Sequence, residues 1–110
     1  MEKNFNKLVR DKIPEIIEGN GETAITRILD DEEYRRELYL KLKEETLEVV
    51  NSDTSEHTIE ELADVYEVLS AIAALEGKNM DDVVEIAKEK KLKRGGFQKR
   101  IFLEKTKDKE

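Results

Sequence analysis

Two pairs of acidic residues have helical spacing and lie in otherwise apolar patterns. Glu45 and Glu48 belong to the segment EETLE at 44–48, and Glu61 and Asp64 follow after a polar break. Residues three apart lie on one helix face, so the four carboxylates can converge if the two helices pack together. Converging acids need a positive partner, and Mg²⁺ or Mn²⁺ takes oxygen ligands. We therefore predict metal ligands at Glu45, Glu48, Glu61 and Asp64.

The apolar rows around these acids strengthen the prediction. Glu45 occupies a core-facing position of its helix, and Glu61 and Asp64 begin a similar row on the next helix. An unpaired carboxylate on such a row is costly to bury. The first row is Tyr34, Leu38, Leu42, Glu45 and Val49, and the second is Glu61, Asp64, Val68, Ala71 and Leu75.

A structural alternative exists for one of these acids. Thr58 and Glu61 have the spacing of a capping box, in which a hydroxyl and a carboxylate satisfy free amides at a helix start. That arrangement would explain Glu61 without any chemistry. It would explain neither Asp64 nor Glu45.

The two helices that carry the acids are the longest in the expected fold. The first is capped by Asp30 or Asp31, with Glu33 completing a capping box, and continues to about Asn51. The polar loop NSDTSEHT at 51–58 returns the chain antiparallel. The second helix begins at Ser55 or Thr58 and ends at Leu75, and it should be the most buried.

Shorter elements flank this pair. Asp11 can cap a short helix that has Pro14 in its first turn and ends before Gly19-Asn20-Gly21. Asn79 and Asp82 cap a helix from Met80 to about Lys93. Segments 23–29 and 100–103 are rich in β-branched or apolar residues and could pair as a small two-stranded ribbon. We expect residues 105–110 to be disordered.

Length and composition indicate one soluble domain, and the helical patterns favour the all-α class. The chain has 110 residues, 43% of them charged, and no cysteine, which excludes disulfides and thiolate chemistry. It has no apolar run long enough for a signal peptide or membrane span, so a cytoplasmic protein with no membrane partner is expected.

The net charge of −7 is unevenly distributed. Residues 88–107 carry nine Lys or Arg against two acids, so the rest of the chain carries −14. An acidic body disfavours a nucleic-acid polymer as ligand, whereas a small phosphorylated ligand between metal and basic groups suits both parts.

Five basic residues are candidates for binding phosphate, each with a plain structural alternative. Lys7, Arg10 and Lys12 cluster near the N-terminus and could be a solvated surface. Lys91 continues an apolar row but could equally extend to solvent at a helix end. Arg94 precedes Gly95-Gly96, which could present amides to an anion or simply end the helix. His57 lies in the polar loop, and we expect it to be solvated.

The pattern E-E-x-x-E, twelve residues, E-x-x-D resembles the signature of the all-α nucleoside triphosphate pyrophosphohydrolase superfamily, which includes MazG-like proteins and phosphoribosyl-ATP pyrophosphohydrolases. The segments NKLVRDKIP at 6–14, KRGGF at 93–97 and KRI at 99–101 resemble its small house-cleaning branch. The similarity extends from Asn6 to about Glu104. It implies a single MazG-like domain over residues 1–110, an antiparallel helical bundle and often a homodimer.

The resemblance also implies an activity. Such enzymes cleave a nucleoside triphosphate between the α and β phosphates, with Mg²⁺ held by residues corresponding to Glu45, Glu48, Glu61 and Asp64. Glu44, Glu45 and Glu48 are the catalytic candidates, and Glu44 is a weaker candidate for a ligand or for orienting water. One alternative is a phosphoribosyl-ATP pyrophosphohydrolase of histidine biosynthesis. Another is a non-catalytic helical dimer that binds a nucleotide or protein.

Overall fold

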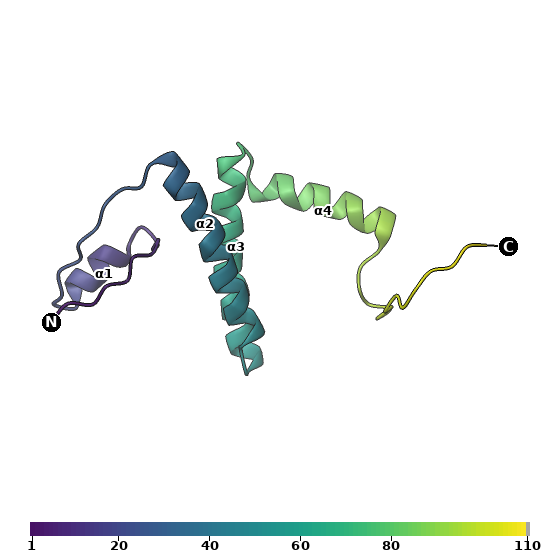
Figure 1. Cartoon of the computed structure of the whole chain (residues 1–110), viewed down its shortest axis with the longest axis horizontal. Helices are drawn as coiled ribbons and strands as arrows, with labels where there is room; N and C mark the ends of the chain where they lie inside the picture. Colours follow the sequence, from purple (N-terminus) through teal and green to yellow (C-terminus); the bar gives the residue numbers. More distant parts are fainter. Residues whose placement is uncertain (110) are drawn as a thin grey trace.

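The computed structural model describes residues 1–109 and is all-helical. Its four helices are α1 (Ile13–Gly19), α2 (Asp31–Val50), α3 (Ser55–Leu75) and α4 (Met80–Arg94). Figure 1 shows α2 and α3 side by side, with α1 and the N-terminal segment at one side of the pair and α4 extending away on the other. The predicted all-α class is confirmed.

Local capping explains where the long helices begin. Asp30 Oδ1 accepts from the Glu33 amide at 2.8 Å, and the Glu33 carboxylate accepts from the Asp30 amide, so the predicted capping box forms. Asn79 and Asp82 form the same arrangement at the start of α4. These side chains satisfy amides that have no partner inside the helix.

The start of α3 removes the structural alternative for Glu61. Thr54 has an extended backbone and its hydroxyl accepts from the His57 amide at 3.1 Å, so the helix begins a full turn before Thr58. Thr58 lies inside the helix and donates to the Thr54 carbonyl. The alternative capping box of Thr58 and Glu61 is therefore wrong, because Glu61 lies beyond the first turn of α3.

The α2–α3 pair has a small core. Leu38, Val68 and Ala73 are the buried hydrophobic residues within 1–109. At one end Arg35 Nη1 donates to Glu76 Oε1 at 2.8 Å, and at the loop end the Ser52 and Thr58 hydroxyls lie 2.6 Å apart. This antiparallel helix pair carries and positions the acidic residues.

Two details differ from the sequence prediction. Lys12, not Asp11, precedes α1, and it makes no side-chain cap. Segments 23–29 and 100–103 form no ribbon, since residues 1–109 contain no strand. The two segments lie at opposite ends of the molecule (Figure 1), and β-forming side chains need a neighbouring strand. Residues 105–109 have no secondary structure, while Glu110 lies outside the described residues.

A further observation concerns membranes. No helix within residues 1–109 combines the length and the apolar character that crossing a bilayer would need.

Candidate metal centre

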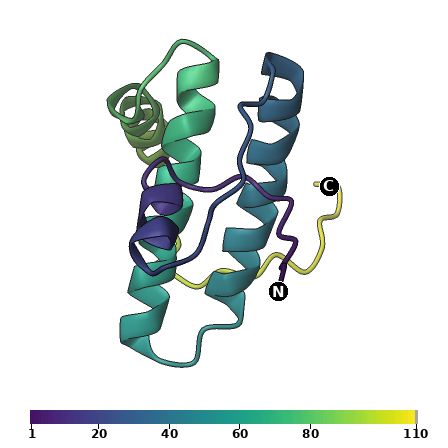
Figure 2. The ribbon, with the colours of Figure 1, turned by 90° about the vertical axis from the view of Figure 1, so that its left-hand side faces the viewer.

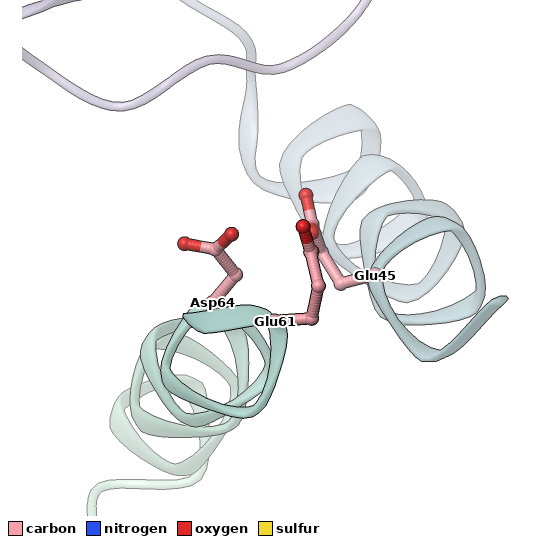
Figure 3. Close-up of side chains that lie close together, drawn as sticks. All are labelled: Glu45, Glu61 and Asp64. Carbon is pink, nitrogen blue, oxygen red and sulfur yellow. The ribbon is translucent and has the colours of Figure 1, made fainter. Parts of the chain in front are cut away.

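Three of the four predicted ligands come together between α2 and α3. Each of Glu45, Glu61 and Asp64 offers a carboxylate oxygen, and these three oxygens lie within 4.8 Å of one another. Figure 3 shows Glu45 projecting from one helix and Glu61 with Asp64 from the other, with all three carboxylates directed to the same side of the pair. The i,i+3 spacing on α3 places Glu61 and Asp64 together, and helix packing brings Glu45 to them.

The other two acids of the motif lie differently. Glu48 is exposed and is not part of the group of three. Its role as a ligand stays a prediction. The Glu44 side chain is 43% exposed and forms ion pairs with Lys41 Nζ at 3.5 Å and Lys7 Nζ at 3.9 Å. Glu44 therefore lies at the rim of the group, where a water or a substrate could reach it.

Each acid of the group has a cationic or titratable partner from the protein. Lys41 Nζ lies 3.5 Å from Glu45, and His57 Nε2 lies 3.1 Å from Glu61. Arg10 Nη2 donates to Asp64 Oδ1 at 2.8 Å. These partners lower the cost of placing three carboxylates together, and a bound cation would have to compete with them.

The electrostatic environment of the acidic group favours added positive charge. Burial raises the pKa of Glu45, the nearby Asp64 carboxylate raises it further, and Lys41 opposes both. Partial burial disfavours the charged form of His57, but hydrogen bonds with Asp53 and Glu61 raise its pKa overall. A cation at this point would stabilise the ionised form of Glu45.

His57 is the residue that the sequence prediction missed. The sequence predicts a solvated position in a loop, yet His57 lies in the first turn of α3 and reaches Glu61 one turn later. The spacing of four residues was visible in the sequence. The Ser55 start, one of the two starts that the sequence offers, puts both side chains on one helix face.

The predicted phosphate-binding residues divide into two groups. Arg10 and Lys7 contact the acidic group or its rim, and exposed Lys12 lies just before α1. Lys91 and Arg94 belong to the last turn of α4, which extends away from the α2–α3 pair (Figure 1). Gly95 follows them with a positive φ of 80°, which glycine adopts without strain, and its amide donates to the Lys91 carbonyl where the helix ends.

The donor set suits a hard divalent cation. All three donors are carboxylate oxygens, the ligand type that Mg²⁺ and Mn²⁺ prefer. Two oxygens on opposite sides of a Mg²⁺ ion lie about 4.2 Å apart, since each bond is about 2.1 Å long. The spacing in the group could therefore reach bonding distance through small side-chain movements, with water molecules completing the coordination.

A comparison with known proteins finds a partial relative. An uncharacterized protein of Mycolicibacterium smegmatis (strain ATCC 700084 / mc(2)155) is 44% identical over 54 residues. The match covers 49% of this chain and 55% of the relative, so the chain spans about half the length of that protein. No family model matches the sequence, and no solved structure matches it. Function is therefore inferred from the acidic group and its surroundings.

Proposed function

We propose that this chain is a Mg²⁺-dependent nucleoside triphosphate pyrophosphohydrolase that removes non-standard nucleotides, with Mn²⁺ as a possible substitute. The observation that supports it best is the convergence of Glu45, Glu61 and Asp64 within 4.8 Å. These residues come from the two halves of one motif, and the capping alternative for Glu61 has been removed. The resemblance to MazG-like proteins supplies the reaction and the substrate class.

The proposed reaction divides its tasks among the chain's own residues. When bound, the cation would neutralise phosphate oxygens and lower the pKa of a coordinated water. Glu45, Glu61 and Asp64 would hold it, while Lys7 and Arg10 bind the phosphates. Water oxygen bonds to a phosphorus of the α,β anhydride, and the bridging P–O bond breaks. The products are a nucleoside monophosphate and pyrophosphate.

The proton released by the attacking water needs an acceptor. Glu44 is the candidate acceptor at the rim of the group, because its side chain is exposed and the residue directly precedes Glu45 in the sequence. Lys41 Nζ lies 3.5 Å from the Glu44 carboxylate and Lys7 Nζ lies 3.9 Å from it, and these two ion pairs restrict where the carboxylate points. We therefore assign Glu44 the role of orienting water or accepting its proton.

Pyrophosphate release tests the proposal directly. We expect release from a panel of standard, oxidised and deaminated nucleoside triphosphates with Mg²⁺ or Mn²⁺, and none with chelator. Including phosphoribosyl-ATP in the panel tests the histidine-biosynthesis alternative, which predicts that this compound is cleaved fastest. Absence of cleavage for every compound, with the protein folded and metal present, would overturn the proposed activity.

A non-catalytic binding protein is the second candidate. The capping boxes account for some acids without chemistry, including Asp30, Glu33 and Asp82, but they account for none of the three acids in the group. Thermal denaturation with increasing Mg²⁺ separates the candidates, since a ligand at 100 times its Kd stabilises a folded protein by about 2.7 kcal/mol. A scaffold without a metal site would show no such shift.

The proposed enzyme is a homodimer, and exposed area supports this. The chain exposes 10603 Å² and has a radius of gyration of 19.2 Å. A compact monomer of its mass would expose about 6300 Å², and one of its length would have a radius near 13 Å. A standard interface covers about 800 Å² per partner, so the excess area is ample for one. A second copy would supply the core that this chain lacks.

An unpartnered apolar stripe on α3 is the proposed contact surface. Ile59, Leu62, Tyr66 and Leu69 follow one another at steps of three, four and three, and each is 38% to 66% exposed. This spacing places them on one helix face. Such a stripe is what a neighbouring helix packs against.

Light scattering at micromolar concentrations should therefore give the mass of a dimer. Replacing Leu62 with glutamate should shift the protein to monomer and lower its stability, because a charge would enter an apolar contact. Glu67→Ala, an exposed position on the same helix, is the matched control and should leave the mass unchanged. A monomeric wild-type chain at these concentrations would contradict the dimer.

A further inference from the structure

The N-terminal segment crosses the helix pair on the side of the acidic group. Lys7 Nζ lies 3.9 Å from Glu44 Oε1 on α2, and Arg10 Nη2 lies 2.8 Å from Asp64 Oδ1 on α3. Leu8 and Val9 between them are half-buried. Figure 2 shows this segment passing across α2 toward α3. We call residues 7–10 the strap.

The three partners of the acidic group differ in what their displacement would move. Lys41 and His57 each lie four residues from their acid on the same helix. Arg10 is 54 residues from Asp64 in sequence. Displacing Lys41 or His57 would reorient a side chain only, whereas displacing Arg10 would release one end of the strap.

Asp64 is also the acid at which an entering cation meets least obstruction. Its side chain is 43% exposed, compared with 15% for Glu45 and 15% for Glu61. Exposed ion pairs of the Arg10–Asp64 type are weak because water competes for both charges. A divalent cation that contacts three carboxylates can therefore displace an arginine that contacts one.

We propose that Arg10 is a stand-in cation on Asp64, and that a divalent metal displaces it, releasing the strap and freeing Arg10 for the substrate's phosphates. Metal would then bind before nucleotide, because the group that holds the phosphate is occupied until Asp64 is taken. This inference rests on the proposed metal site. It assigns Arg10 two successive partners, where the sequence alone indicated only phosphate.

The first test compares the metal affinity of an Arg10 variant with that of wild type. Whether the affinity rises or falls decides the outcome. Arg10→Gln should bind Mn²⁺ about two- to five-fold more tightly than wild type, since the competing pair is lost, as measured by calorimetry on the whole chain. Arg35→Gln is the matched control. It breaks another 2.8 Å, long-range pair of similar exposure, to Glu76, and should leave the affinity unchanged.

Release of the strap provides the second test, independent of activity. Limited trypsin digestion, followed by mass spectrometry, should cut after Lys7 and Arg10 faster when Mg²⁺ is present. Cleavage after Lys105 in the irregular C-terminal segment serves as an internal reference. Asp64→Asn should give the fast pattern without metal, because the carboxylate that holds Arg10 has lost its charge.

The outcomes separate this inference from the proposed function. If wild type binds metal but Arg10→Gln binds it equally or more weakly, the stand-in role is overturned and the metal site stands. Unchanged or slower cleavage of the strap with Mg²⁺ would also overturn it. If neither protein binds metal, both the site and the inference fail. Tighter binding by Arg10→Gln together with metal-induced cleavage supports the exchange.

Discussion

Replacing Glu61 by glutamine should lower the rate of pyrophosphate release roughly 100-fold or more and abolish stabilisation by Mg²⁺. The amide keeps the side-chain shape but removes a negative charge from a group whose oxygens lie within 4.8 Å of one another. Metal-ion catalysis supplies several kcal/mol of transition-state stabilisation, and each 1.36 kcal/mol is tenfold in rate. Steady-state kinetics and thermal shift with Mg²⁺ would measure both effects.

Two matched variants make this prediction specific. Glu60→Gln removes the same charge from the adjacent, exposed position, so activity close to wild type is expected. Glu48→Gln tests the one predicted ligand that the structure leaves outside the group. Loss of metal-induced stabilisation in Glu48→Gln would restore Glu48 to the ligand set, while full activity in Glu61→Gln would remove the proposed site altogether.

Replacing Glu45 by glutamine should stabilise the metal-free protein at pH 7 by about 0.5–2 kcal/mol, the usual gain from relieving an unfavourable charge. The pKa of Glu45 is raised above its usual 4.5, chiefly by burial. The folded state therefore holds a proton that the unfolded chain gives up, so stability falls as pH rises from about 4.5 through the folded pKa. Glutamine cannot ionise and removes that loss.

Denaturant unfolding at several pH values would measure this effect. The advantage of Glu45→Gln should be present at pH 7 and should shrink as the pH falls toward 4.5, where wild-type Glu45 regains its proton. Saturating Mg²⁺ should reverse the order, because wild type gains binding free energy that the variant has lost. If the metal-free variant is less stable than wild type at pH 7, the main effect of Glu45 on stability is its ion pair with Lys41.

The starts of α2 and α4 could be predicted because capping is local. Asp30 and Glu33, and likewise Asn79 and Asp82, lie three residues apart, so their contacts depend on almost nothing beyond the first helical turn. The same locality explains why the sequence leaves the start of α3 open between Ser55 and Thr58. Two hydroxyl residues, Thr54 and Thr58, could each begin α3, and the extended backbone at Thr54 decides between them.

The acidic group could be predicted only in part, because it depends on how one helix is rotated against another. Glu61 and Asp64 share a face by spacing alone. That Glu45 joins them while Glu48 stays exposed is set by the packing of α2 on α3. Leu38 is the buried residue of α2. Because so few side chains of α2 are buried, its apolar spacing alone did not determine how the helix is rotated against α3.

The amino-acid sequence by itself determined the all-helical class, the main helix boundaries and the pattern of acids that could hold a metal. Only the tertiary structure decided which acids meet, that His57 bonds Glu61, and that Arg10 reaches Asp64 across 54 residues. It also decided that segments 23–29 and 100–103 remain apart. The physical reason is range: capping and helical spacing act within one turn, whereas these contacts depend on where packing places distant segments.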